Sequence, residues 1–244
     1  MVAYNYSTID VPGGEYADAL AINDFGQIIG VYSDSNSYFQ AFLDIDGVFT
    51  TIGPAGSLSN TYAYSINTSG QIVGSYTNSS GGYDGFLYSG GIYTTINPPG
   101  SVSTVAYANN ASGQLVGYYT DSSGNHGFLD SGGVYTTIDP PGSTYTIANS
   151  INSSGQVAGY YQDSSGNLHG FVDSGGAYAT INDPLGTSTV VYGVNNSGEV
   201  VGFYIDNSGN YHGFLDNGGV YTTIDGPGSI YTVATGINNL GEVF

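Results

Sequence analysis

Short apolar segments alternate with glycine-rich polar segments along the whole chain. In one stretch the apolar segments are "YTIANSIN" (145–152), "QVAGYY" (156–161), "HGFVD" (169–173) and "AYATIN" (177–182). Their length and their content of Tyr, Val, Ile, Phe and Thr are typical of β-strands. The polar segments "SSG", "QDSSGNL" and "SGG" between them are suited to tight hairpins, which join antiparallel neighbours. The pattern therefore predicts a four-stranded antiparallel meander.

This meander is repeated along the chain. One marker of the repeat is the phenylalanine series Phe42, Phe86, Phe128, Phe171 and Phe214, whose spacings are 44, 42, 43 and 43 residues. A second marker, Asn-x-x-Gly-Gln/Glu, recurs with the same period. A repeated four-stranded meander of this length is the pattern of a β-propeller blade. We therefore predict an all-β fold, a β-propeller whose complete repeats span about 16–53, 60–97, 103–139, 145–182 and 188–225.

The number of blades follows from the ends of the chain. The fourth-strand sequence, of the type "YTTI", occurs six times, whereas the third-strand sequence occurs five times. We therefore expect a single domain over residues 1–244, a six-bladed ring in which residues 4–10 and 231–244 form a shared, incomplete closing blade without free sheet edges. Self-association through this incomplete blade is one consequence. A five-bladed ring with both ends outside it is the alternative.

The repeat resembles the extracellular HAF-type repeats of bacterial proteins, named for a His-Ala-Phe motif that follows an Ile-Asn-x-x-Gly-Gln-Val-Val-Gly segment. Here the first part reads "INDFGQIIG", "INTSGQIVG", "NNASGQLVG", "INSSGQVAG" and "VNNSGEVVG", and the second reads "QAF", "DGF" and three times "HGF". The resemblance covers essentially the whole chain, although Gly replaces Ala in most copies and a "YTTIDPPGS" tail stands where many members have a Leu-Gly-Thr-Leu-Gly-Gly type segment. It implies a secreted or cell-surface location and no particular activity. No secretion signal is visible in the sequence, since "MVAYNYSTID" lacks a basic region.

The charge of the chain limits its partners. All 19 charged residues are acidic, because the chain contains no Lys and no Arg. Phosphate backbones and anionic lipid headgroups are bound mainly by cationic side chains, so we expect neither nucleic acid nor an anionic membrane as a partner. Cysteine is absent, which leaves no disulfide framework and no thiolate metal site.

The three histidines occupy one position of the repeat. His126, His169 and His212 follow equivalent hairpins, and Gln40 and Asp84 occupy this position in the first two repeats. Equivalent positions in successive blades are rotated about the propeller axis, so we do not expect the imidazoles to converge on one metal ion. A structural role is the favoured interpretation. No catalytic motif stands out from the repeat, and the chain is therefore predicted not to be an enzyme.

The hairpins between strands two and three share one predicted face with the loops between blades. Asp and Asn oxygens beside a glycine turn are hard-cation ligands, so calcium is a candidate there, although the same residues also suit any hairpin. The candidate calcium ligands are Asp34, Asp121, Asp163 and Asp206, beside Asp10, Asp139 and Asp225 on the same acidic face.

Tyrosines are the second kind of candidate ligand residue. An aromatic ring with a hydroxyl group suits stacking on a sugar, but most tyrosines are expected to fill the space between blades. Those near loop ends are the ligand candidates, together with the neighbouring aspartates: Tyr119, Tyr161, Tyr204, Asp121, Asp163 and Asp206.

The favoured hypothesis is a non-enzymatic extracellular β-propeller that acts as a binding or surface-interaction module. Its partner would be a neutral glycan or a surface protein, with a neutral sugar favoured because no cation is present to pair with an acidic one. Two alternatives stay open: a propeller hydrolase or lyase, which needs a pocket with nonequivalent acidic residues, and a structural subunit of a surface layer or filament.

Overall fold

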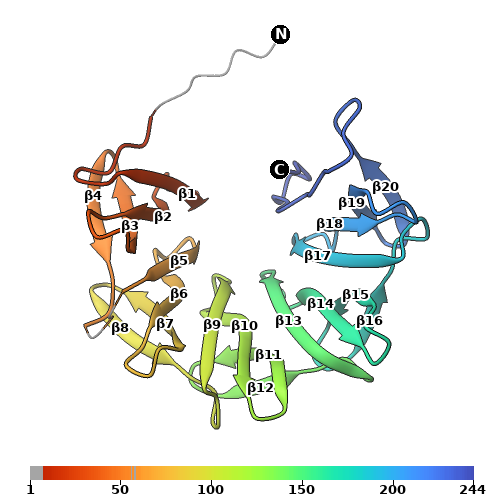
Figure 1. The fold of residues 1–244 in the computed structure, drawn as a ribbon, viewed down its shortest axis with the longest axis horizontal. Coiled ribbons are helices and arrows are strands. Elements are labelled where there is room, and N and C mark those ends of the chain that lie inside the picture. The colour runs from red at the N-terminus through yellow and green to blue at the C-terminus, as the bar shows by residue number, and fades with distance from the viewer. Residues whose placement is uncertain (1–7, 56, 58) are drawn as a thin grey trace. The chain divides into compact units, whose positions relative to one another are not determined.

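The computed structural model describes residues 8–55, 57 and 59–244. Within this part, the named elements are strands, and they form five four-stranded antiparallel sheets. In each sheet the four strands lie side by side in chain order, as Figure 1 shows. No helix in the described part is long and apolar enough to cross a membrane. The predicted all-β chain of four-stranded meanders is confirmed.

The chain divides into two compact units, residues 1–96 and 97–244. The first unit holds two sheets, with strands β1 (Tyr16–Ile22), β2 (Ile28–Ser33), β3 (Phe39–Ile45), β4 (Val48–Ile52), β5 (Thr61–Ile66), β6 (Ile72–Thr77), β7 (Tyr83–Ser89) and β8 (Ile92–Ile96).

The second unit holds three sheets. Their strands are β9 (Ser103–Asn109), β10 (Gln114–Asp121), β11 (Gly124–Ser131), β12 (Tyr135–Ile138), β13 (Ser143–Ile151), β14 (Val157–Asp163), β15 (Leu168–Asp173), β16 (Tyr178–Ile181), β17 (Ser188–Val194), β18 (Val200–Ile205), β19 (Tyr211–Asn217) and β20 (Val220–Ile224). The predicted boundaries of the blade at 145–182 agree with β13 to β16 within a few residues.

The final segment begins a further meander. Ile237 and Val243 form an antiparallel bridge, and the amide of Thr235 donates to the carbonyl of Phe244 at 2.8 Å. The strand predicted for residues 4–10 falls largely outside the described residues, which begin at residue 8. The closing blade, the blade count and the single domain therefore stay predictions.

The phenylalanines that mark the repeat form the centre of each sheet's core. Phe42, Phe86, Phe128, Phe171 and Phe214 are each 0% exposed. Each lies opposite a strand-two glycine, as Phe128 lies opposite Gly117. A side chain at Gly117 would collide with the carbonyl oxygen of Val105 on the neighbouring strand. The glycine of the strand-two segment and the phenylalanine of the "HGF" segment thus recur together. The glycine leaves room for the backbone of strand one, and the phenylalanine opposite it fills the core.

The first strand of every sheet contains a β-bulge at the same position. The bulged residues, which have no partner on strand two, are Leu20, Tyr64, Tyr107, Asn149 and Tyr192. A bulge bends the strand and redirects its side chain. The bulge thus decides the direction in which the side chain of the bulged residue points.

The Asn-x-x-Gly-Gln motif links neighbouring sheets. In the second unit, Asn152 Oδ1 accepts hydrogen bonds from the backbone amides of Ser154 (3.1 Å) and Gln156 (3.0 Å). Its Nδ2 donates to Gln156 Oε1 (2.8 Å) and to the carbonyl of Asn195 in the next sheet (3.0 Å). All hydrogen-bonding groups of this buried amide are therefore used. Within the units, Asn23 and Asn110 make the same bond to the following sheet, and Asn195 makes it to Asn238 in the final segment.

Tyrosines of the fourth strands make a second link between sheets. The hydroxyl oxygen of Tyr93 accepts from the amide of Gly53 at 2.9 Å, and that of Tyr135 accepts from the amide of Asn97 at 3.2 Å. In the first unit β8 thus contacts the residue that follows β4, and in the second unit β12 contacts Asn97 at the start of that unit. This agrees with the expectation that most tyrosines occupy the space between sheets.

Candidate functional site

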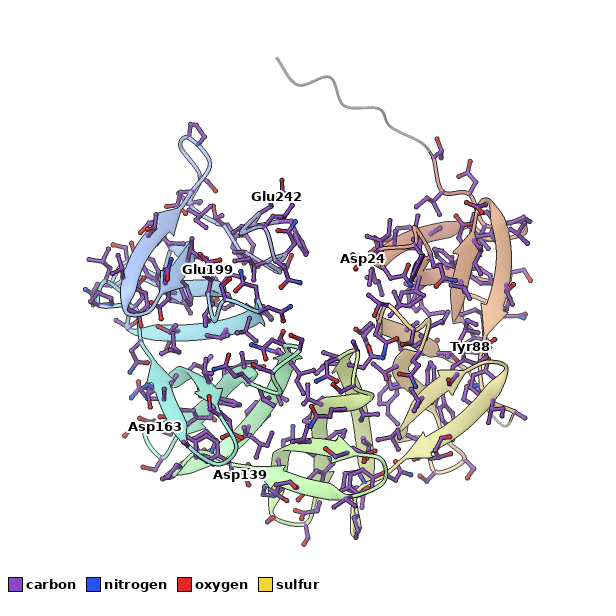
Figure 2. All side chains as sticks on the ribbon, turned by 180° about the vertical axis from the view of Figure 1, so that it is seen from behind. Asp24, Tyr88, Asp139, Asp163, Glu199 and Glu242 are labelled. Atoms are coloured by element: carbon purple, nitrogen blue, oxygen red, sulfur yellow. The ribbon has the colours of Figure 1, made fainter. Side chains whose placement is uncertain are left out.

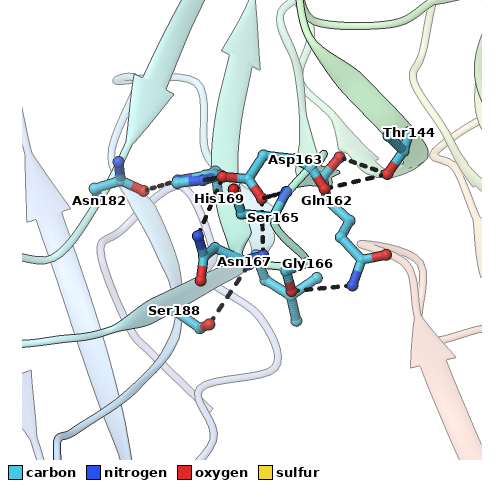
Figure 3. A network of polar contacts seen from close by, with 10 residues as sticks. Thr144, Gln162, Asp163, Ser165, Gly166, Asn167, His169, Asn182 and Ser188 are labelled. Carbon is cyan, nitrogen blue, oxygen red and sulfur yellow. Dashed lines mark hydrogen bonds and ion pairs between the residues drawn. The ribbon is translucent and has the colours of Figure 1, made fainter.

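The hairpins between strands two and three each hold a carboxylate or amide at the centre of a polar network. In the sheet β13 to β16, Asp163 Oδ1 accepts from the amides of Ser165 (2.8 Å) and Asn167 (2.9 Å). Its Oδ2 lies 3.2 Å from His169 Nε2, and Nδ1 of the same ring lies 3.0 Å from Asn182 Oδ1 (Figure 3). The imidazole therefore joins the hairpin to the loop that leads to the next sheet.

The other two histidines make the same connection with a second aspartate. His212 lies 3.3 Å from Asp206 and 2.7 Å from Asp225, and His126 Nδ1 lies 2.6 Å from Asp139. Hydrogen bonds and the charge of the two aspartates raise the pKa of His212. The backbone amide of Asn210 and further turn contacts lower the pKa of Asp206 to about 2.

The aspartates proposed as calcium ligands are all engaged in this way. Asp34 accepts from two backbone amides of its own turn, and Gln40 takes the place of the histidine. Asp121, Asp163 and Asp206 each bind the turn and their histidine. Among the described residues, no group of three or more His, Asp or Glu side chains is arranged to hold a metal ion. A calcium site here would need backbone or water oxygens, and calcium stays a prediction.

The tyrosines proposed as ligand residues lie against these histidines. The ring centroids of Tyr119 and His126 are 5.3 Å apart, and those of Tyr161 and His169 are 5.2 Å apart. Tyr204 stacks on its histidine in the same way, but it is only 4% exposed. Its ring therefore offers little surface to a ligand, and its hydroxyl is paired with Thr223 at 3.1 Å.

A different set of aromatic side chains forms a continuous strip in the second unit. The ring centroids of Tyr192 (β17) and Phe203 (β18) are 6.0 Å apart, those of Phe203 and Tyr211 (β19) 5.1 Å, and those of Tyr211 and Tyr231 5.0 Å. Tyr231 follows β20 and is 66% exposed, whereas Phe203 is 8% exposed and supports the strip from below the surface. We call Tyr192, Phe203, Tyr211 and Tyr231 the aromatic strip.

Neighbouring sheets of the second unit carry related pairs. Tyr107 and Tyr118 are 5.8 Å apart, and Tyr145 and Tyr160 are 6.1 Å apart. Burial, followed by the nearby phenols, raises the pKa of Tyr160, and burial together with Tyr231 raises that of Tyr192. Both hydroxyls are neutral at physiological pH, as tyrosines ordinarily are, and can donate and accept hydrogen bonds.

Sequence reasoning did not identify the aromatic strip. It favoured the second tyrosine of "GYY" because that residue lies nearer the loop, whereas the strip uses the first position, occupied by Phe203. Adjacent strand residues point to opposite faces, so one step along the strand changes the neighbours completely. The bulge at Tyr192 also changes the direction of its side chain, and no local sequence pattern predicted this bulge.

Two open cavities lie beside the turns that join strand one to strand two and strand three to strand four in the second unit. One, of about 490 Å³, is lined by Ser112, Gly113, Gln114, Ser131, Gly132, Ser153 and Ser154. The other, of about 560 Å³, is lined by Gln114, Leu129, Ser154, Gly155, Gln156, Ser174 and Gly175. Neither is lined by an acidic residue. Gln114 and Gln156 are the last residues of the Asn-x-x-Gly-Gln motif. In the two later copies of this motif, also in the second unit, the position is occupied by Glu199 and Glu242 (Figure 2).

No protein-family model matches the chain, and no curated protein sequence matches it either. Solved structures do resemble it. TolB from Acinetobacter baumannii is similar with a TM-score of 0.61 at 12% identity, over 83% of this chain and 52% of TolB. A lectin from Burkholderia pseudomallei has a TM-score of 0.53 at 17% identity, over 91% of this chain and 72% of the lectin. A variant of the Aleuria aurantia lectin in complex with alpha-methyl-L-fucoside has a TM-score of 0.51 at 15% identity, over 86% and 76%.

Proposed function

We propose that the protein is an extracellular β-propeller that binds a neutral carbohydrate at the exposed Tyr231 end of the aromatic strip, without cleaving it. The observation that carries the proposal is the strip itself, in which four rings in contact end at the exposed Tyr231. A pyranose presents an apolar face of C–H groups, which packs on an aromatic ring, and hydroxyls, which pair with phenols.

The chemistry of the surroundings favours a neutral ligand. The chain has no Lys or Arg to pair with a carboxylate or sulfate group on an acidic sugar. The Tyr192 phenol is uncharged at neutral pH, and burial raises its pKa further above the ordinary value. Lectins among the similar structures support the ligand class, and the resemblance to HAF-type repeats supports the extracellular location.

The alternative of a propeller hydrolase needs nonequivalent acidic residues in one pocket. The two cavities between Ser112 and Gly175 are lined by neutral residues at equivalent positions of consecutive sheets. These cavities do not supply a pair of catalytic carboxylates. Binding without cleavage is therefore favoured over glycoside hydrolysis there.

Glycan-array screening followed by calorimetry tests the proposal. We expect binding of neutral glycans, tested with a panel that includes alpha-methyl-L-fucoside. Tyr231→Ala should weaken binding about tenfold, since loss of a stacked ring costs on the order of 1 kcal/mol beyond its buried area. Tyr16→Ala is the control, because Tyr16 is 55% exposed and lies outside the strip. The absence of binding to every neutral glycan, or an equal effect of both variants, would refute the proposal.

A further inference from the structure

One of the three histidine hairpins is a residue shorter than the others. It reads "DSSGNH" from Asp121, whereas the equivalents read "DSSGNLH" from Asp163 and "DNSGNYH" from Asp206. In the short hairpin, β10 continues to Asp121 and β11 starts at Gly124, with their ends paired directly. The loop between the strands is therefore reduced to Ser122 and Ser123.

The shortening brings a serine onto the imidazole. Ser123 Oγ lies 2.8 Å from His126 Nε2, and His126 Nδ1 lies 2.6 Å from Asp139 Oδ2. In all three hairpins Nε2 lies 3.2 to 3.3 Å from the hairpin aspartate, so the serine contact is what distinguishes His126. A hydroxyl, an imidazole and a carboxylate in this sequence of contacts form the arrangement that activates a serine nucleophile.

Asp139 is fixed in place beside the ring. It stands at the end of β12, directly before the buried Pro140, and its backbone amide is hydrogen bonded to Tyr178. Its Oδ1 atom is buried and has no hydrogen-bond partner. The carboxylate therefore directs its one strong hydrogen bond to His126 Nδ1, which holds the proton there and leaves the Nε2 lone pair facing Ser123.

We propose that Ser123 is a nucleophile towards activated esters, with His126 as its general base and Asp139 as the residue that orients the imidazole. With an aryl ester, Oγ forms a bond to the carbonyl carbon, the hydroxyl proton moves to His126 Nε2, and the bond to the aryloxide breaks; the imidazolium passes this proton to the aryloxide, which leaves as the phenol. In deacylation, water gives a proton to His126 Nε2 as its oxygen bonds to the acyl carbon. The bond from this carbon to Oγ then breaks, His126 returns the proton to Oγ, and the carboxylic acid leaves. The reactivity is separate from carbohydrate binding, because no residue of the aromatic strip takes part.

Asp121 is the competing partner of the hydroxyl. Its Oδ1 lies 2.6 Å from Ser123 Oγ and 3.3 Å from His126 Nε2. The single hydroxyl hydrogen points either to Asp121 or to His126, and only the second orientation leads to proton transfer to the base. Asp121→Asn tests this point, because Asn78 fills the same turn position in the second sheet and accepts from the amide and hydroxyl of Ser80 as Asp121 does from those of Ser123.

The protonation of the base gives the reaction a pH signature. Burial of the ring opposes protonation, but the hydrogen bond and charge of Asp139, together with Asp121, outweigh burial and raise the pKa of His126. Only the neutral imidazole accepts a proton, so acylation should increase with pH through this raised pKa and then level off.

The test uses p-nitrophenyl acetate and a sulfonyl fluoride with the full chain, and mass spectrometry locates the modified residue. We expect Ser123 to be labelled about a hundredfold faster than Ser165, its equivalent in a longer hairpin, since a positioned base contributes on the order of 10²–10⁴ in rate. Ser123→Ala and His126→Gln should abolish the fast labelling. Glutamine is tolerated at this position, because Gln40 occupies it in the first sheet.

Two further variants test whether the fast labelling depends on the length of the hairpin or only on the residues present. A leucine inserted between Asn125 and His126 restores the longer hairpin and keeps all three residues, and it should remove the fast labelling. Ser165→Ala should leave the labelling unchanged, and Ser123→Ala should leave glycan binding unchanged. The proposal would be overturned if many serines were labelled at equal rates, or if the insertion variant kept the fast labelling of Ser123. Loss of labelling in Asp121→Asn would show that Asp121, and not His126, is the base.

Discussion

The contribution of the asparagine link between sheets can be measured with Asn152→Ala. Asn152 is 4% exposed, and its side chain makes five hydrogen bonds of 2.8 to 3.1 Å. A net hydrogen bond contributes about 1 kcal/mol, and partners left buried without one cost more. Water can reach part of the turn, so we expect the variant to lose about 2–4 kcal/mol of unfolding free energy.

A second substitution separates the two halves of this amide. Asn152→Asp keeps the oxygen that accepts from Ser154 and Gln156 but removes both donors. The new carboxylate then faces the carbonyl oxygen of Asn195 and Gln156 Oε1. We expect a loss comparable to that of the alanine variant, because the link to the next sheet is broken and two acceptors face a negative charge.

The matched control is Asn196→Ala in the neighbouring turn. Asn196 is exposed and accepts from the amide and hydroxyl of Ser153 at 2.9 and 2.8 Å. Its removal should change stability by no more than about 0.5 kcal/mol. Urea unfolding followed by tyrosine fluorescence gives the midpoints, since the chain has 24 Tyr and no Trp. Equal midpoints for Asn152→Ala and Asn196→Ala would refute the importance of the link, and a neutral Asn152→Asp would refute the part assigned to its donors.

Three further outcomes are expected. Gly159→Ala should destabilise the fold by more than about 3 kcal/mol, since its new methyl would collide with the carbonyl of Ile147, whereas Gly166→Ala in an exposed turn should cost only about 1 kcal/mol; urea midpoints that do not differ would contradict this. His212 should titrate above 6.5 by NMR, so the stability that it gains from Asp225 is complete below pH 6.5 and is lost as pH rises through the folded value; a midpoint at or below 6.5 would contradict this. Millimolar calcium should raise the melting temperature relative to chelator if it binds the acidic hairpins, and identical melting curves would count against a structural calcium role.

Much of the sheet architecture followed from the sequence because it depends on local rules. The predicted strands of the repeat at 145–182, their order and the hairpins between them agree with β13 to β16. Residues that favour β-strands alternate with glycine turns, and each strand or hairpin is specified by residues that are close together in the sequence. The Asn-x-x-Gly turn was also recognisable, but its bond from Asn152 to Asn195 was not, since it joins residues 43 positions apart.

The candidate sites were harder to predict because they depend on single-residue shifts. The aromatic strip depends on which of two adjacent strand-two positions faces the neighbouring rings, and Tyr192 is further redirected by a bulge. The contact between Ser123 and His126 depends on one missing residue in a hairpin. In a residue-type pattern, both differences look like ordinary variation between repeats.

In an array of nearly identical sheets, a residue present in every copy is explained first by the fold. The five buried phenylalanines and the linking asparagines are of this kind, since each copy needs them to pack on the next. The bulge is a feature of the backbone that does not depend on one side chain. It occurs in all five sheets, but the bulged residue varies: Leu20, Tyr64, Tyr107, Asn149 and Tyr192. Asn149 uses the position for a 2.7 Å bond to Val191 of the next sheet, whereas Tyr192 uses it for a ring contact. The fold therefore requires the bulge but not its side chain, and this freedom allows one sheet to carry the proposed binding surface while its neighbours serve as scaffold.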